Sequence, residues 1–208
     1  AFASSKSVGK AIEYQGNRVD IKELCQEDIA GLDVFFFSAG AERSRDWAPI
    51  AVKNGSIVID NSSAFRMDES VPLVIPEINW HAVRPQDRLF AVPNCTAIVL
   101  LMAIAPLRAL GKIQRVIVST YQSASGAGAA AMDELRNQTS SVLEGEKPIP
   151  VVLPHPYAFN LFSHNTLLNE SGYNDEEWKV IHESRKILDD DNLKINVTCI
   201  RVPVLRAH

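Results

Sequence analysis

Cysteine is scarce in this 208-residue sequence, which contains only Cys25, Cys95 and Cys199. Three cysteines that lie 70 and 104 residues apart fit neither a zinc cluster nor a disulfide framework. We therefore expect reduced thiols, no metal site and a cytoplasmic protein. We also expect Cys25 and Cys199 to be packing residues, as cysteines commonly are.

An excess of positive charge and long apolar runs are also missing. The chain has 21 lysines and arginines against 25 aspartates and glutamates, and the basic residues are scattered. This balance excludes a nucleic-acid-binding surface. No apolar run approaches the roughly 20 residues that cross a bilayer, and no signal peptide opens the sequence. We expect no nucleic-acid partner and no membrane partner.

Hydrophobic residues make up 46% of the chain, enough for the core of one large domain or two small ones. The sequence opens at Ala1 without an initiator methionine and stops directly after a strand-like segment. We therefore expect the central part of a longer protein.

The first half of the chain contains a strand–helix–strand pattern. A continuous apolar run at residues 33–40 predicts a parallel strand buried on both faces, with its three phenylalanines in the core. A helix fits residues 42–54, and a second buried strand fits residues 56–61. This βαβ pattern predicts a parallel sheet with helices on its faces, which binds ligands at the carboxyl ends of its strands. Ser38, Ala39 and Gly40 follow the first strand directly.

Cys95 lies at the predicted start of a helix that extends to about residue 110. Pro93 fixes the turn before it, and Asn94 is a candidate N-cap. Backbone N–H groups at a helix start favour a thiolate and can hold an oxyanion. On residue statistics alone, a buried structural cysteine is the more common alternative. We expect the boundary between two domains near Asn94.

Two polar segments leave alternatives open. Residues 4–7 form a hydroxyl-rich turn around Lys6 that suits a phosphate, or is simply a solvated turn. Arg66 stands in the polar loop after the second strand, where it could clamp a phosphate or carboxylate, or pair with Asp68 or Glu69 at the surface.

The second half of the chain alternates predicted strands and helices. Strands fit residues 112–120 and 192–201, and helices fit the segment ending at about residue 143 and residues 174–190. Glu176 and Lys179 are three apart in the last helix and therefore share a face. Trp178 is predicted as a packing residue.

Five motifs occur in a fixed order and spacing. They are DNSSAFRM at residues 60–67, PNCT at 93–96, STYQSASGAG at 119–128, ESRKIL at 183–188 and RVPVLRAH at 201–208. Together they closely resemble the aspartate-semialdehyde dehydrogenase family, over nearly the whole chain. Where many members have Cys-Ser-Thr, this chain has Cys95, Thr96 and Ala97.

The resemblance implies an α/β fold of two incomplete domains. Residues 1–93 would form a Rossmann-like, parallel-sheet NADP-binding domain, and residues 94–208 an α+β catalytic, substrate-binding and dimerisation domain. The expected assembly is a homodimer or homotetramer.

The resemblance also assigns roles around the reacting thiol. Cys95 matches the nucleophile, Gln122 the side chain that orients substrate and acyl intermediate, and His208 the acid/base. The substrate-binding and phosphate-binding residues are Arg201 for the α-carboxylate, Glu176 for the amino group, and Arg66, Asn94 and Lys179 around the phosphate.

Cofactor contacts fall in three short segments. The residues matching NADP contacts, including the strand-end set named above, are Ser4, Lys6, Ser7, Ser38, Ala39, Gly40, Ser125, Gly126, Ala127, Gly128 and Ala129.

The implied reaction interconverts L-aspartyl-4-phosphate and L-aspartate 4-semialdehyde, with inorganic phosphate, through a Cys95 thioester in lysine, methionine and threonine biosynthesis. An N-acetyl-glutamyl-phosphate reductase-like enzyme is an alternative, although that family uses a Pro-Gly-Cys motif. A truncated, catalytically silent nucleotide-binding or subunit-interaction module is another. Activity with each aldehyde would separate the first two, and NADPH binding would test the third.

Overall fold

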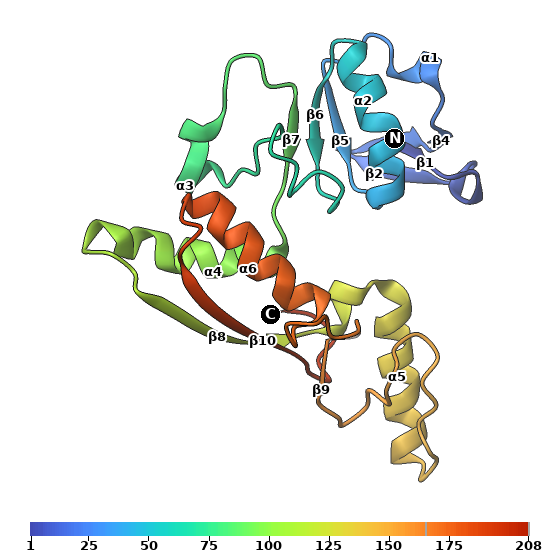
Figure 1. Ribbon diagram of the computed structural model, residues 1–208. Helices are drawn as coiled ribbons and strands as arrows, with labels where there is room; N and C mark the ends of the chain where they lie inside the picture. Colours follow the sequence, from blue (N-terminus) through green and yellow to red (C-terminus); the bar gives the residue numbers. More distant parts are fainter. Residues whose placement is uncertain (165, 208) are drawn as a thin grey trace. The chain divides into compact units, whose positions relative to one another are not determined.

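The computed structural model describes residues 1–164 and 166–207, without the side chain of Lys6 (Figure 1). The chain divides into two compact units, Ala1–Pro93 and Asn94–His208. Within the described ranges, no helix is both long enough and apolar enough to cross a membrane.

The first unit is built on a three-stranded parallel sheet. Its strands β5 (Val34–Phe37), β6 (Ile57–Asp60) and β7 (Leu89–Ala91) lie in that order. Helix α2 (Ala41–Lys53) connects β5 to β6, so the predicted βαβ unit and parallel sheet are confirmed. The loops after β5 and β6 leave the sheet at its carboxyl edge, where ligands bind in folds of this class.

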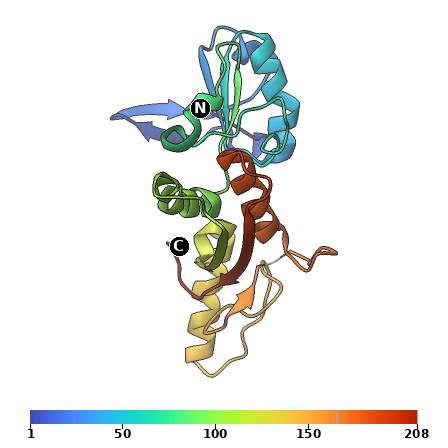
Figure 2. The same ribbon diagram turned by 60° about the vertical axis from the view of Figure 1, so that its left-hand side comes forward.

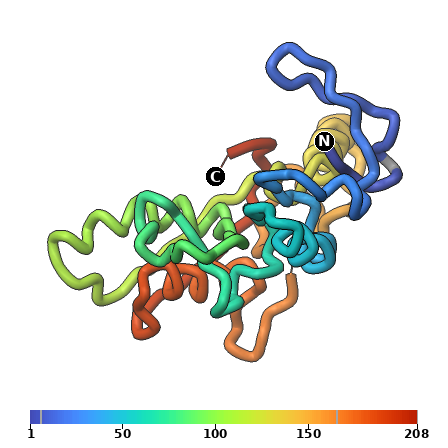
Figure 3. Tube along the Cα trace, turned by 90° about the horizontal axis from the view of Figure 1, so that it is seen from above, coloured from blue at the N-terminus to red at the C-terminus, as the bar shows by residue number. Residues whose placement is uncertain are grey.

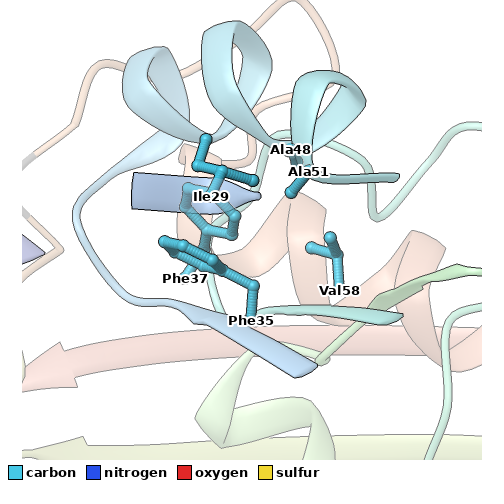
Figure 4. Close-up of a cluster of buried hydrophobic side chains, with 6 residues drawn as sticks. All are labelled: Ile29, Phe35, Phe37, Ala48, Ala51 and Val58. Carbon is cyan, nitrogen blue, oxygen red and sulfur yellow. The ribbon is translucent and has the colours of Figure 1, made fainter. Parts of the chain in front are cut away.

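A buried cluster lies between one face of this sheet and the helices (Figure 4). The rings of Phe35 and Phe37 stack with centroids 4.4 Å apart, and small residues on α2 let the helix approach the strands closely. The residues of the cluster are Ile29, Phe35, Phe37, Ala48, Ala51 and Val58.

Phe36 corrects the prediction of a strand buried on both faces. It is 72% exposed, while its two neighbours are buried. Successive side chains of a strand point to opposite faces, and helix α2 covers only the face that carries Phe35 and Phe37. Because the run of three phenylalanines contains no polar residue at the exposed position, the sequence predicts burial on both faces, and this prediction is wrong for Phe36.

A projecting β-hairpin, which was not predicted, joins strands β2 (Ala11–Tyr14) and β3 (Asn17–Asp20) (Figures 2 and 3). Its turn residues Gln15 and Gly16 both have positive φ, at 51° and 77°, as a type I′ turn requires. The remaining elements of the unit are β1 (Phe2–Ala3), the 3-10 helix η1 (Ser5–Ser7), β4 (Lys22–Glu23), α1 (Gln26–Ile29), α3 (Pro76–Asn79) and η2 (Trp80–Ala82).

Cys25 was wrongly predicted as a packing residue. It precedes α1 at the surface, and its Sγ donates to Asp28 Oδ2 at 2.9 Å. Helix α1 buries only Ile29, at its end, so the thiol that precedes its first residue meets solvent instead of the core.

The second unit has a mixed three-stranded sheet in the order β8 (Arg115–Gln122), β10 (Lys194–Arg201) and β9 (Phe162–Ser163). Strand β10 is parallel to β8 and antiparallel to β9. Helices α4 (Cys95–Ile104) and α6 (Asp175–Leu188) lie on one side of the two long strands (Figures 1 and 2). The other elements are η3 (Ala105–Ala109), η4 (Ala124–Ala127) and α5 (Ala129–Leu143).

Helix α6 has a complete capping box at its start. The side chain of Asn174 accepts from Glu177 N at 2.9 Å, and Glu177 Oε2 accepts from Asn174 N at 3.0 Å. Such caps stabilise a helix by about 1 kcal/mol. The predicted helix 174–190 is therefore confirmed with small differences at its ends. Trp178 contacts the ring of His182 at a centroid distance of 4.0 Å but is 41% exposed, so it packs on one side only.

Candidate active site

Cys95 is exposed at the first residue of α4. Asn94 is the N-cap, as predicted: its Oδ1 accepts from Thr96 N at 2.9 Å and from Ala97 N at 3.3 Å. This cap fixes the first turn beneath the thiol. The structure thus excludes the alternative of a buried structural cysteine, which describes Cys199 instead, where burial raises the pKa of the thiol to about 11.

Two buried carboxylates of α6 hold Asn94 in place. Its backbone N–H donates to Glu183 Oε2 at 2.5 Å, and its Nδ2 donates to Glu176 Oε1 at 2.9 Å. Both Oδ1 and Nδ2 of the Asn94 side chain therefore form hydrogen bonds within the protein. The start of α4, and with it Cys95, is tied to a second helix more than 80 residues away in the sequence.

Gln122 and Arg201 are cross-strand partners at the carboxyl ends of β8 and β10. The predicted strand 112–120 runs on to Gln122 because β10 continues to pair with it as far as Arg201. In parallel strands, paired residues point to the same face of the sheet. Both side chains are buried on the face that also carries α4 and α6.

Arg201 is a buried cation, and some of its N–H groups form no hydrogen bond with the described residues. It is only 3% exposed; Nη1 donates to Ser123 O at 2.7 Å, and Nη2 lies 2.9 Å from His164 Nε2. Its Nε has no partner among the described residues. A fixed guanidinium with unused N–H groups is suited to bind a carboxylate through two parallel hydrogen bonds.

His164 was not singled out from the sequence, where nothing distinguished it among five histidines. Burial and then the positive charge of Arg201 lower its pKa to about 4. The imidazole is therefore neutral at neutral pH, and Nε2 can accept from Arg201 Nη2. Strand β9 brings it there, because Phe162 pairs with Arg201 and His164 N donates to Cys199 O.

Glu176 supplies the negative charge of the site. Burial opposes its ionisation, but the hydrogen bond from Asn94, the His164 and Lys179 side chains and the hydrogen bond from Thr96 together outweigh burial and lower its pKa. Lys179 Nζ lies 4.0 Å from Glu176 Oε2, which confirms that the two side chains share a face of the helix.

These side chains line one cavity of about 310 Å³ within the second unit. It brings together eight residues predicted as site residues: Asn94, Cys95, Gln122, Gly126, Ala127, Glu176, Lys179 and Arg201. Val152, Leu153 and His164 complete the lining. The cavity therefore places an exposed thiol together with two cationic side chains, Arg201 and Lys179, and the Glu176 carboxylate.

Several predicted site residues are not in this lining. Ser125, Gly128 and Ala129 flank Gly126 and Ala127 in the chain, and Gly128 takes φ 95° as the N-cap of α5. His208 lies outside the described residues. Arg66 belongs to the first unit, where it is buried and donates to Val92 O at 2.8 Å and Asn61 O at 3.0 Å.

The first unit has its own cavity, of about 590 Å³. Ser4, Ser38 and Ala39 line it, together with Arg43 and several aromatic residues. Gly40 adjoins Ala39 in the chain, Ser7 ends the 3-10 helix η1 that follows Ser4, and the side chain of Lys6 is outside the described part. Hydroxyls, a guanidinium and the N-terminus of α2 suit phosphate oxygens, and the aromatic faces suit a base.

Within residues 1–164 and 166–207, no group of three histidine, cysteine, aspartate or glutamate side chains is arranged to hold a metal ion.

Two family models cover most of the chain. The model described as "Semialdehyde dehydrogenase, NAD binding domain" matches residues 1–86, and the one described as "Semialdehyde dehydrogenase, dimerisation domain" matches residues 104–208. The two matches lie in the first and second structural units respectively.

Known proteins resemble the chain over its whole length. It is 47% identical to the aspartate-semialdehyde dehydrogenase of Synechocystis sp., covering 100% of this chain and 61% of that protein. A crystal structure of aspartate semialdehyde dehydrogenase II from Vibrio cholerae superimposes with a TM-score of 0.92 at 38% identity, covering 98% of this chain and 62% of that one. A structure of that enzyme complexed with ASA gives a TM-score of 0.91, at 38% identity and 98% and 61% coverage. The chain thus spans about three fifths of the length of the proteins it matches.

Proposed function

The chain belongs to the semialdehyde dehydrogenase family, and from that premise we propose that the whole protein is a phosphorylating, NADP-dependent aldehyde dehydrogenase. Its proposed reaction interconverts L-aspartyl-4-phosphate and L-aspartate 4-semialdehyde, in lysine, methionine and threonine biosynthesis. One observation carries the proposal: an exposed Cys95 at a helix start shares a cavity with Gln122, Glu176 and Arg201.

The charges of the cavity match this substrate. Arg201 offers unused donors to an α-carboxylate, and Glu176 offers an anion to an α-ammonium. The relatives above carry the name of this activity, and one related enzyme has been crystallised with ASA. Lys179 and Asn94, which line the cavity of the second unit, and Arg66 of the first unit are each proposed to bind phosphate.

The chemistry follows from the reacting thiolate. Sulfur attacks the acyl carbon, a C–S bond forms, and the C–O bond to phosphate breaks as inorganic phosphate leaves. Asn94 already occupies the N–H groups of Thr96 and Ala97, so the Cys95 N–H is the donor of that turn that would meet the oxyanion. His208 is the proposed acid/base for the thiol proton. In the reverse direction the aldehyde is oxidised in the presence of phosphate.

A nicotinamide cofactor fits the first unit, which matches an NAD-binding family model. The proposed contacts are the Ser4–Ser7 turn, Ser38, Ala39 and Gly40 in that unit, and residues 125–129 in the second. When bound, the cofactor supplies the hydride that reduces the thioester. NADP in particular is proposed on the serine hydroxyls of residues 4–7 and the single cation among them, Lys6.

We also propose that the protein forms a homodimer or homotetramer. The second unit matches a dimerisation-domain model, and the sheet face opposite α4 and α6 exposes Ile117 at 75% and Tyr121 at 69%. Large apolar side chains on an open sheet face suit a second copy of the chain. The three free cysteines fit the cytoplasmic location that we propose.

Replacing Cys95 tests the proposed function directly. In the whole protein, Cys95→Ala should lower phosphate-dependent NADPH formation from L-aspartate 4-semialdehyde by at least roughly 1000-fold, because the covalent route is lost. Cys25→Ala, which removes another exposed thiol, should leave turnover unchanged. Retained turnover in Cys95→Ala would overturn the proposal, and turnover of N-acetyl-glutamate semialdehyde instead would reassign the substrate.

A further inference from the structure

The hydroxyl group of Thr96 lies between two side chains of the candidate active site. Gln122 Nε2 donates to Thr96 Oγ1 at 2.9 Å, and Thr96 Oγ1 lies 3.3 Å from Glu176 Oε1. All three side chains are buried. Thr96 itself does not line the cavity, but both of its partners do.

The direction of each hydrogen bond in this group is fixed by chemistry. An ionised carboxylate only accepts, so Thr96 must give its single hydroxyl hydrogen to Glu176. Thr96 Oγ1 is then an acceptor for Gln122, which must present its NH₂ end. Turning the amide over would place its oxygen about where Nε2 now stands, 3.5 Å from Glu176 Oε1, and two acceptors would repel each other.

This orientation decides what Gln122 offers to a ligand. Its Nε2 is directed toward Thr96 and Glu176, with Cys199 Sγ 3.7 Å away. The amide oxygen Oε1 is the end left for the cavity that Gln122 lines. Glu176 is divided in the same way: its Oε1 is engaged with Asn94 and Thr96, and its Oε2 is on the side of Lys179.

We propose that Thr96 is a positioning residue that fixes Gln122 as a hydrogen-bond acceptor beside the Glu176 anion, so that the cavity recognises the ammonium group of its substrate. The inference rests on the proposed function for the identity of that substrate. Discrimination between an amino-aldehyde and the same aldehyde without its amino group then depends on the Thr96 hydroxyl, although this hydroxyl does not contact either aldehyde.

Two variants of the whole protein separate the hydroxyl from the bulk of Thr96. Thr96→Val keeps the shape and removes the hydroxyl, while Thr96→Ser keeps the hydroxyl and is the matched control. Each is assayed with L-aspartate 4-semialdehyde and with succinate semialdehyde, which lacks the amino group. Thr96→Val should lower kcat/KM for the amino-aldehyde by about 10- to 100-fold and change that for succinate semialdehyde by less than about threefold. Thr96→Ser should keep the wild-type ratio of the two.

An equal loss with both aldehydes would overturn the proposal, because a purely structural role lowers both alike. If Thr96→Val does not fold, Thr96→Ala takes its place, since it removes the hydroxyl without adding an atom. In a Gln122→Ala background, Thr96→Val should lower discrimination by less than about threefold further. A full further loss there would show that Thr96 does not act through Gln122.

Failure of the proposed function gives a different result. If the wild-type protein turns over neither aldehyde, that function is wrong, whatever Thr96 does. The hydrogen-bond network is then tested by thermal unfolding of Thr96→Val, Gln122→Ala and the double variant. The shift in Tm caused by Thr96→Val should be smaller in the Gln122→Ala background, and strictly additive shifts would overturn the network.

Discussion

The two candidate ligand cavities, one in each unit, have different linings. The cavity of the first unit, about 590 Å³, is lined mainly by aromatic and small residues, together with the charged side chains of Arg43 and Glu23. The cavity of the second unit, about 310 Å³, is lined by charged and amide side chains that hold one another by hydrogen bonds. A change in the first cavity should therefore alter one contact, whereas a change in the second should disturb several.

The molecule also has a buried arginine in each unit. Arg66, in the first unit, donates to the backbone carbonyls of Val92 and Asn61, so the main chain helps to fix the position of its guanidinium. Arg201, in the second unit, donates to one carbonyl and is also held by the His164 imidazole. The position of Arg201 therefore depends on a second side chain that can be substituted or titrated.

The largest effect is expected at Arg201. Arg201→Lys keeps the positive charge but cannot reach Ser123 O and His164 together while also binding a carboxylate, so kcat/KM should fall by roughly 100- to 1000-fold. The control is Arg108→Lys in the same unit, whose guanidinium donates to Leu188 O outside the site. Steady-state kinetics of the whole protein checks both. Near-wild-type kinetics in Arg201→Lys would show that a positive charge alone is sufficient for substrate binding. It would also contradict the view that a change in the second cavity disturbs several contacts at once.

His164 should make the second unit sensitive to acid. Its pKa is about 4 in the folded state against about 6.5 when unfolded, so the unfolded chain takes up this proton first as the pH falls. Its contribution to stability is therefore present above about pH 6.5 and is lost as the pH falls toward about 4. Arg201 and Lys179 oppose protonation there, and Glu176 and Asp175 favour it.

The measurement is urea unfolding at pH 7 and at pH 5 for the wild type and for His164→Gln, which can still accept from Arg201 through its amide oxygen. The variant should lose less stability between the two pH values. Titrating groups outside the site are common to both proteins, so their contributions cancel in the comparison, and the difference reports His164 together with the Glu176 carboxylate that interacts with it. Equal losses would show that His164 is not buried as a neutral group.

The smallest effect is expected in the first cavity. Arg43→Gln removes its guanidinium and should raise the Kd for NADPH by roughly three- to tenfold, with kcat at saturating cofactor unchanged. Lys53→Gln, at the opposite end of α2, is the control and should change neither. Calorimetric titration with NADPH measures the affinity. A loss of kcat without a loss of affinity would contradict the prediction, because it would mean that Arg43 affects turnover and not cofactor binding.

Local signals in the sequence were sufficient for the framework of the site. Pro93 and Asn94 set the start of α4, Asn174 the start of α6, and the spacing of Glu176 and Lys179 put both on one face. Each of these depends on residues within one turn of helix, which is why the sequence alone predicts them. The βαβ unit followed from apolar runs of the right length.

What the sequence did not reveal depends on pairing between distant segments. His164 reaches Arg201 only because β9 pairs with the end of β10, and Thr96 meets Gln122 only because α4 lies on the sheet. The open face of β5 was missed because Phe36 looks like its neighbours. The hairpin was missed because Gln15 and Gly16 are a weaker turn signal than asparagine and glycine.

The pairing of Gln122 with Arg201 has a consequence for how the gene can change. About 70 residues separate β8 from β10, and insertions in the loops between them leave the two strands in place. A single-residue insertion within either strand, between its first paired residue and its end, would turn Gln122 or Arg201 to the opposite face of the sheet. Among relatives, insertions and deletions should therefore occur in the loops and be absent from these two eight-residue strands.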